Sequence, residues 1–162
     1  MKSTLFKFIL LIVISNLILS CSKNDEEIEP TTIEQITFNN LEAEVLYLVN
    51  NHRTNIGLQK VSALNHPYTE AVNHTKYMIE QGKTSHDNFV IRRNNLMINS
   101  SAKIILENVA AGYSTAESVM KQWLSSQSHR EVIENPEVNY MGISAQTDSR
   151  GINYYTQIFI KK

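Results

Sequence analysis

Residues 152–160, near the end of the chain, strongly limit the kind of fold that the chain can adopt. As a strand, residues 152–160 would place one set of side chains on each face: Ile152, Tyr154, Thr156, Ile158 and Ile160 on one, and Asn153, Tyr155, Gln157 and Phe159 on the other. Large apolar groups occur in both sets, whereas a strand with one solvent-exposed face carries apolar side chains on the other face only. We therefore expect a sheet covered by helices on both faces. Its final strand should pair with Tyr140–Gln146 through a turn at Asp148–Gly151.

Apolar residues at helical spacing predict the covering elements. A first helix should start near Asn39 or Asn40, because the residues after it follow a 3.6-residue period: Leu41, Val45, Leu48, Val49 and Ile56. A second helix is expected from Asn65, with Pro67 in its first turn, to Gly82.

The remaining elements are predicted from shorter signals. Residues 88–99 favour a short helix, and Ile104–Leu106 a short strand that delivers Glu107. Ser114–Glu117 and Ser128–Glu131 have the pattern of capping boxes, each opening a further helix. Trp123 falls on the apolar face of the first of these helices, so we expect it in the core.

The N-terminal twenty residues have the pattern of an export leader. Lys2 and Lys7 form a basic region, and residues 8–19 are an apolar run interrupted only by Ser15 and Asn16. Such a run is shorter than the roughly 20 apolar residues of a spanning helix and typical of a secretory signal. The single cysteine, Cys21, follows this run directly, as in the cleavage site of a bacterial lipoprotein. We therefore expect residues 1–20 to be removed and Cys21 to be lipidated.

Residues 21–37 are expected to form a lipidated cysteine followed by an acidic, flexible tether. This segment is polar, with no apolar period, and carries five acids and one lysine: Asp25, Glu26, Glu27, Glu29, Glu34 and Lys23. The whole chain has 15 basic and 16 acidic side chains. Without leader and tether the rest is therefore near neutral, and no basic field favours nucleic acid. Residues 38–162 are long enough for one domain with its own core, and a lone cysteine excludes an internal disulfide.

Three polar clusters next to the predicted helices contain the candidate functional residues. They contain His86 in Thr84–Asp87, Glu107 in Glu107–Ala110, and His129 in Trp123–Arg130. Two imidazoles and a carboxylate can move protons or hold a metal ion. Each cluster is expected in a loop-like stretch, and separations of 21 and 22 residues mean that only the fold can bring them together.

The order of these clusters resembles the CAP superfamily, the SCP or pathogenesis-related-1 type domain, and especially its bacterial lipoproteins. The resemblance covers Leu41 to Ile160 and is carried by these pieces: Leu48-Val49-Asn50, Arg53, Gly57-Leu58, AVNHTKYMIEQGKTSH, ENVAAGY, WLSSQSHREVIENP, the MGI strand and YYTQIF. It implies an α+β fold, a three-layer α-β-α sandwich with a mostly antiparallel central sheet. It also implies that His86, Glu107 and His129 line one cleft.

The resemblance leaves the role of this trio open. Relatives with four site residues have a further Glu where Gln127 is the candidate here, and a neutral amide is neither a base nor a strong zinc ligand. Glu131 or Glu134 could replace it in space. The trio itself fits a zinc site with an open position, an imidazole base oriented by Glu107, or a structural polar network. Ser85, Ser126 and Ser128 lie nearby, yet none has the setting of a nucleophile. His52 is expected at the core boundary, and His66 and His74 at the surface.

Three functions follow from these readings. The first is an envelope lipoprotein, lipid-anchored at the outer membrane or cell surface, whose cleft binds a lipid, a peptide, another envelope ligand or a metal ion such as zinc. The second is a hydrolase or protease acting on envelope or extracellular material. The third is a structural or adhesion module with a vestigial site, so enzymatic activity stays undecided at this stage. In each case the expected partner is the membrane, reached through the lipid anchor.

Overall fold

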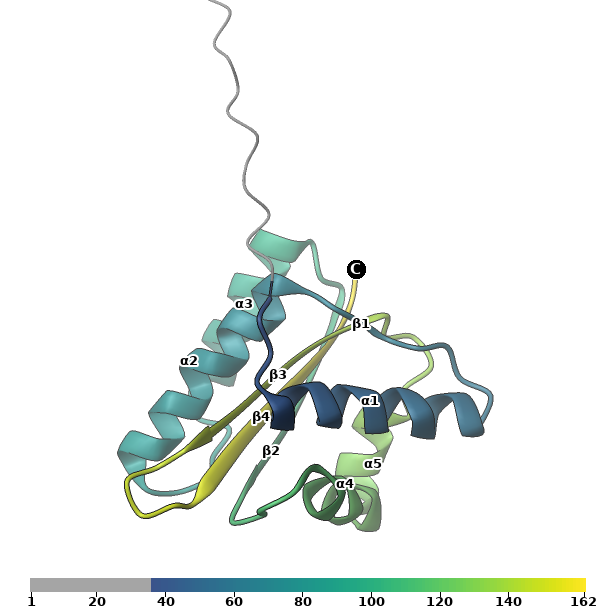
Figure 1. Cartoon of the computed structure of the whole chain (residues 1–162). Coiled ribbons are helices and arrows are strands. Elements are labelled where there is room, and N and C mark those ends of the chain that lie inside the picture. The colour runs from purple at the N-terminus through teal and green to yellow at the C-terminus, as the bar shows by residue number, and fades with distance from the viewer. Residues whose placement is uncertain (1–35) are drawn as a thin grey trace, which may run out of the picture. The chain divides into compact units, whose positions relative to one another are not determined.

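The computed structural model describes residues 36–162 (Figure 1). The expected leader, Cys21 and nearly all of the expected tether lie outside the described residues. No helix in the described part is both long enough and apolar enough to cross a membrane.

A four-stranded sheet forms the middle layer, in the order β1-β3-β4-β2. The strands are β1 (Ser62–Ala63), β2 (Ile104–Ala111), β3 (Tyr140–Thr147) and β4 (Asn153–Lys161). β1 pairs with β3 in parallel, and the other two pairings are antiparallel. The predicted C-terminal hairpin is therefore confirmed, and β2 lies at one edge of the sheet.

Helices cover both faces of the sheet (Figure 1). α2 (Asn65–Gln81) packs on β3 and β4, with α3 (Phe89–Ser100) beside it. The opposite face carries α1 (Asn40–Asn55), α4 (Ala116–Ser125) and α5 (Gln127–Ile133). The α+β sandwich with helices on both faces is therefore confirmed.

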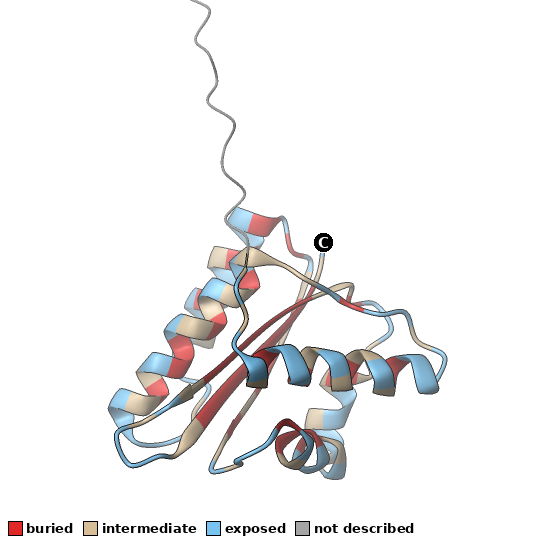
Figure 2. Cartoon of the chain, in the orientation of Figure 1, coloured by how far each residue is buried: buried red, intermediate tan, exposed pale blue. Residues whose placement is uncertain are grey.

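The strand β4 is buried on both faces, as its alternation predicts (Figure 2). Tyr155 and Phe159 join the larger cluster with α1, α4 and α5. Ile158 and Ile160 join a second cluster with α2 and α3. This two-sided burial explains why β4 carries large apolar groups in both registers.

The Glu107 cluster does not lie in the expected loop-like stretch, which corrects that prediction, whereas the helix expected at Ser128–Glu131 is present and carries His129. Glu107 lies inside β2, which is longer than the predicted strand Ile104–Leu106, because β4 offers pairing partners as far as Ala111. His129 lies in the first turn of α5. His86 alone lies between helices, in the segment that joins α2 to α3.

Several helices begin beside the predicted residue. The N-cap of α4 is Thr115, whose hydroxyl accepts from Ser118 N, in place of the expected Ser114–Glu117 box. α2 has Leu64 at its N-cap, and α5 has Ser126, each without a side-chain hydrogen bond. Burial of an apolar face decides these starting points, since a cap contributes only about 1 kcal/mol. Asn39 does cap α1, with Glu42 completing the box.

A buried guanidinium joins α1 to the chain that leads into β3. Arg53 is fully buried, and its Nη1 donates to the carbonyls of Ile133 (2.6 Å) and Asn135 (2.9 Å). Its Nε donates to Gln59 O at 2.9 Å. Its Nη2 donates to a fourth carbonyl, Val138 O, at 3.4 Å. Buried backbone acceptors without partners are costly, so one side chain here satisfies four carbonyls, one at the end of α5 and three outside helices and strands.

Close contact between α2 and β3 requires a glycine at position 142. A Cβ at Gly142 would overlap the backbone of Pro67 and Tyr68 in the first turn of α2. The absent side chain therefore sets the spacing of this helix from the sheet.

We expect Trp123→Ala to lower the free energy of unfolding by about 3–5 kcal/mol, the usual cost of truncating a buried Trp. Trp123 is fully buried and packs edge-on against Tyr155, with ring centroids 6.2 Å apart. Its Nε1 donates to Val109 O. Urea unfolding measures the loss. The control is Tyr47→Ala on the outer face of α1, where the side chain is 67% exposed and the expected change is within about 0.5 kcal/mol. A loss below about 1 kcal/mol for Trp123→Ala would contradict the packing described.

Candidate functional site

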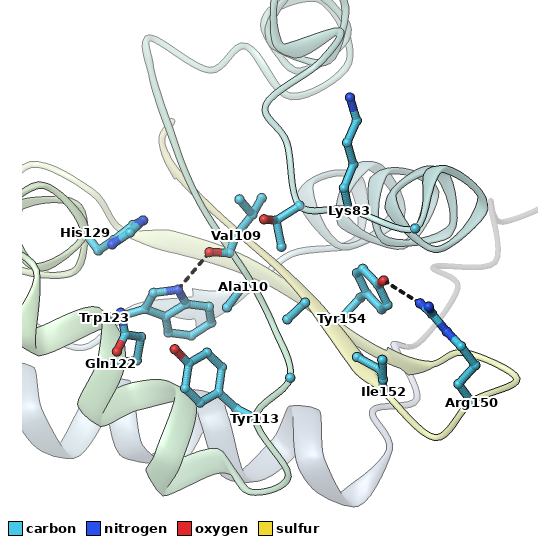
Figure 3. Close-up of a pocket in the computed structure, with 14 residues that line it drawn as sticks. Lys83, Val109, Ala110, Tyr113, Gln122, Trp123, His129, Arg150, Ile152 and Tyr154 are labelled. Atoms are coloured by element: carbon cyan, nitrogen blue, oxygen red, sulfur yellow. Dashed lines mark hydrogen bonds between the residues drawn. The ribbon is translucent and has the colours of Figure 1, made fainter.

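A groove follows the free edge of β2. Its larger cavity, of about 480 Å³, is floored by Val109–Gly112, and a smaller one of about 290 Å³ surrounds Ile105–Glu107. The segment Gly82–Phe89 lines both cavities on one side. The other side is formed by α4 and α5, through Trp123 and His129 in the larger cavity (Figure 3) and Val132 in the smaller one. We call this feature the β2 groove.

The backbone of β2 presents hydrogen-bonding groups to this groove. In an antiparallel pair, alternate residues turn their N–H and C=O groups toward and away from the partner strand. Gly112 N donates to Asn153 O, so the even-numbered residues of β2 face β4. The odd-numbered residues face outward: Ile105, Glu107, Val109 and Ala111. Among the described residues, the one bond to these outward groups is from Trp123 Nε1 to Val109 O, at 3.3 Å.

Glu107 is the buried centre of the smaller cavity. Arg92 from α3 binds its carboxylate with two bonds, Nε to Oε2 and Nη2 to Oε1, each 2.8 Å. His86 Nδ1 lies 2.8 Å from Oε1. The Glu107 side chain is 1% exposed and that of His86 is 53% exposed, so the imidazole connects a buried ion pair to solvent. An ionised carboxylate only accepts, so Nδ1 carries the proton and Nε2 is the ring nitrogen left for the groove.

The electrostatic balance keeps Glu107 ionised. Burial by itself raises the pKa of this carboxyl group, but hydrogen bonds from His86 and Arg92, together with the charge of Arg92, outweigh burial and lower the pKa below 4.5. The group is therefore a carboxylate at neutral pH and cannot donate a proton there.

The segment that carries His86 is fixed from three sides. Arg92 Nη1 donates to Asp87 O at 2.6 Å, and Tyr77 Oη donates to the Asp87 carboxylate at 3.0 Å. His74 Nε2 lies 2.7 Å from Ser85 O. A carbonyl only accepts, so His74 must carry its proton on Nε2. These contacts set the position of His86 from α2 and α3.

The prediction that His74 is a surface residue was wrong. It is 2% exposed, and burial lowers the pKa of its imidazole despite the bond to Ser85. Its place on the stripe of Ala71, Thr75 and Met78 was a usable signal in the sequence. Arg92 was missed in the same way, since it shares a helix face with Leu96. The other two histidines lie as expected: His66 is exposed, and His52 is half-buried against Glu134.

His129 lines the larger cavity, beside Trp123 (Figure 3). Its backbone carbonyl accepts from Asn108 Nδ2 at 3.0 Å, which ties α5 to the sheet. Its Nδ1 is buried without a partner among the described residues. Burial, and then the neighbouring His86, lower the pKa of this imidazole, so it is neutral at pH 7. The three residues thus lie along one groove, with His86 on Glu107 and His129 on the facing wall.

The other candidates for a fourth site residue point elsewhere. Gln127 is exposed and donates to Glu131 at 2.9 Å. Glu134 pairs with His52 at 2.8 Å, near the end of α1. The amide that does line the larger cavity is Gln122, one residue before Trp123.

The donor set does not fit a zinc site that uses Glu107 as a ligand. Both oxygens of this carboxylate accept from Arg92, and a guanidinium at 2.8 Å would compete directly with a dication. In residues 36–162, no three His, Cys, Asp or Glu side chains are grouped as metal ligands.

A serine nucleophile is not prepared in the groove either. Ser126 and Ser128 contact each other through their hydroxyls, and Ser85 Oγ accepts from Asp87 N. Within the described chain, the one contact between a serine hydroxyl and an imidazole joins Ser100 to His66, away from the groove.

Several polar groups of the larger cavity were not singled out in the sequence. Lys83 and Arg150 lie on its rim, with Tyr113 and Tyr154 in its wall (Figure 3). Arg150 is held by Asp148 at 2.8 Å and reaches Tyr154 Oη at 3.3 Å. Tyr154, which the sequence analysis placed on one face of the final strand, lines this cavity. The others come from turns, where spacing carries no signal.

Comparison with known proteins identifies the family. Residues 46–159 match the sequence model of CAP, the cysteine-rich secretory protein family, so this chain belongs to the CAP family. A curated relative, the uncharacterized protein YkwD of Bacillus subtilis (strain 168), is 40% identical over 62 residues. That match covers 38% of this chain and 23% of YkwD, so most of the relative lies outside it.

Solved structures share the fold. An outer surface protein of Borrelia burgdorferi superposes with a TM-score of 0.70 at 18% identity, over 78% of this chain and 96% of that one. An extracellular SCP-domain protein of Bacillus anthracis gives 0.68 at 25% identity, over 82% of this chain and 44% of that one. NaASP2, solved with Zn²⁺, superposes with a TM-score of 0.56 at 14% identity, over 78% of this chain and 82% of NaASP2. At such identity NaASP2 shows the fold alone.

We expect Glu107→Gln to lower the free energy of unfolding by about 3–5 kcal/mol at pH 7, because it leaves Arg92 buried without its counter-charge. His86→Ala should cost less than about 1 kcal/mol, since that side chain is half exposed. Because the pKa of Glu107 in the folded state lies below 4.5, its ionisation contributes stability that is complete above pH 4.5. This contribution is lost as the pH falls through the lowered pKa.

Urea unfolding of wild type and Glu107→Gln between pH 7 and pH 3 tests this directly. The difference in the free energy of unfolding between the two proteins should shrink only below pH 4.5. A constant difference across the range would contradict the ionised pair.

Proposed function

We propose that this protein is an envelope-anchored binding protein, and that its β2 groove binds an extended polypeptide segment as an additional strand. The observation that carries the proposal is the free edge of β2 at the floor of a groove. Its outward N–H and C=O groups, at Ile105, Glu107 and Ala111, have no partner among the described residues. Strand addition of this kind supplies affinity through main-chain bonds and specificity through side-chain pockets.

The walls explain how this edge avoids general aggregation. An open edge strand is normally blunted by charges, proline or a covering element. Here the segment Gly82–Phe89 and the α4–α5 pair stand on either side of the edge. Another sheet would meet these walls, whereas a single extended chain fits between them.

The side chains along the groove suit a peptide. His86 and His129 place imidazoles next to the expected path; the ring of His86 is held by Glu107, and the backbone of His129 is held by Asn108. Lys83 and Arg150 lie at the rim of the larger cavity and favour an acidic residue or a terminal carboxylate there. The smaller cavity is largely apolar, with Phe89, Ile105 and Val132 in its wall, and suits an apolar side chain.

The other functions find less support in the geometry. A zinc site that uses Glu107 as a ligand conflicts with the two bonds from Arg92 to Glu107. A serine hydrolase would need a hydroxyl activated by His86 or His129, and no serine of residues 36–162 bonds to either ring. A purely structural role leaves unexplained why β2 keeps free backbone groups in a groove, since buried or half-buried polar groups are costly without partners.

The strand-addition proposal is tested by selecting a phage-displayed library of linear peptides on residues 22–162 and synthesising the enriched peptide. We expect Val109→Pro to weaken its binding by at least about tenfold, because the proline ring replaces the outward N–H and fills its place. Proline is tolerated on an edge strand when the lost N–H faces away from the partner. Val109→Ala is the matched control, which keeps the N–H and should keep the affinity.

Hydrogen exchange supplies an independent readout of the same complex. Bound peptide should slow exchange at the outward amides Ile105, Glu107 and Ala111. The inward amides Leu106, Asn108 and Ala110, already bonded to β4, should change little. Equal affinity of Val109→Pro and Val109→Ala, or a library that yields no enriched peptide, would refute strand addition.

The envelope location rests on the leader and Cys21, with support from relatives. Two structural neighbours are described as an outer surface protein and an extracellular protein. We propose that Cys21 is lipidated and anchors the domain to the outer membrane or cell surface.

Wild-type protein should float with membranes and incorporate labelled palmitate, while Cys21→Ser should remain an unprocessed precursor without label. One acyl chain binds a bilayer only marginally, so stable flotation requires the several chains of a bacterial lipoprotein. Mature wild-type protein that stays in the aqueous phase would refute the anchor.

A further inference from the structure

The outward face of α3 is apolar. Val90, Ile91, Met97 and Ile98 are 67%, 59%, 42% and 79% exposed. At 100° per residue these four positions and Asn94 fall within one stripe opposite the buried Arg92 and Leu96. Scattered exposed apolar residues are ordinary, whereas a contiguous patch of them marks an interaction surface.

The rest of the chain supplies little to cover this patch. The 14 residues between Cys21 and Ile36 contain two large aliphatic side chains, Ile28 and Ile33, among several acids. Two aliphatic side chains are too few to cover the four exposed apolar side chains of α3. The occupant is therefore sought outside the chain.

The patch lies at the end of the domain where the described chain begins. Phe38 packs edge-on against Tyr68 in the first turn of α2, with ring centroids 5.4 Å apart. His66 in the same turn contacts Ser100, the last residue of α3, at 3.0 Å. Figure 1 shows the start of the described chain, the end of α3 and the C-terminus at one end of the domain. The described chain therefore begins at the end of the domain where α3 ends.

Basic side chains surround this end. Arg93 is exposed at the border of the stripe, and Lys103 follows α3 after two residues, bonded through its N–H to Lys161 O. Lys162 ends the chain beside them. The region also holds an acid, Glu70, which accepts from Asn95. An apolar stripe bordered by cations is the composition of a surface that lies on an anionic bilayer.

We propose that the exposed face of α3 docks the domain onto the bilayer to which Cys21 is anchored. This inference rests on the lipid anchor of the proposed function, but not on the peptide ligand. Fourteen residues reach at most about 50 Å when extended, so the anchor keeps α3 within reach of the headgroups. At such proximity a weak surface contact suffices, because the second binding event is intramolecular. Docking through α3 also holds the groove near the membrane, since Phe89 at the start of α3 lines its smaller cavity.

The test places a tryptophan on the stripe. Ile98→Trp is compared with Tyr47→Trp, an exposed position on α1, which covers the opposite face of the sheet. Native Trp123 is fully buried and serves as an internal reference in both. Each full-length lipidated protein is reconstituted into vesicles of phosphatidylethanolamine and phosphatidylglycerol, with or without brominated acyl chains.

We expect the Ile98→Trp emission to shift to shorter wavelength and to be quenched by the brominated chains, while Tyr47→Trp is unaffected. Adding Ile91→Glu to Ile98→Trp should abolish the quenching without changing flotation. Equal quenching of both tryptophans, or none at Ile98→Trp in protein that floats, would overturn the docking surface. Self-association in solution that Ile98→Glu abolishes would overturn it in favour of a second copy of the chain.

A second arm separates failure of the anchor from failure of docking. Residues 22–162 contain all of the described core, so the same tryptophan variants of this soluble chain are titrated with excess vesicles. Quenching confined to Ile98→Trp supports the docking face even if the full chain fails to float. Absence of quenching in both arms overturns it.

Discussion

The buried pair between Glu107 and Arg92 is the interaction on which the site depends. Glu107 projects from β2 and Arg92 from α3, so their two bonds join the edge of the sheet to the helix that covers it. Arg92 also holds Asp87 O, and Glu107 accepts from His86. The segment carrying His86 is therefore positioned by a charge pair that water does not reach. A pair of this kind contributes to specificity of arrangement more than to net stability, because both charges must first be desolvated.

The position of β2 gives the groove its character. β4 is paired on both sides and β1 pairs with β3 only at Tyr140 and Met141, whereas one side of β2 is unpaired along its whole length. Trp123 covers one of its outward carbonyls and at the same time fills the core under α4. The groove is thus part of the same packing that stabilises the domain. Its floor is a strand of the central sheet, and its two walls are the segment Gly82–Phe89 and the α4–α5 pair.

The fold and the site were predicted to different extents. The burial of β4 on both faces followed from alternation over residues 152–160, and the helices on both sides followed from β4. The clusters around His86, Glu107 and His129 were singled out from the sequence, and the structure places them along the β2 groove, His129 at the larger cavity and the other two at the smaller one. Arg92 and His74 were missed, because a charged or polar residue on an apolar stripe has no local sign of its distant partner. The free edge of β2 could not be inferred, since strand order depends on pairings between distant segments.

The sequence alone determined which residues are apolar at which period, and with that the layers, the core position of Trp123 and the leader pattern ending at Cys21. These properties are local, because they depend on side-chain type and on spacing of two or 3.6 residues. The tertiary structure decided that Glu107 is paired and ionised, that His129 lies across a groove from His86, and that the outward face of α3 stays uncovered. Each of these depends on which segments meet across separations of 15 residues or more, as Arg92 and Glu107 do. The physical reason is that burial and charge pairing act between neighbours in space, and the fold alone defines those neighbours.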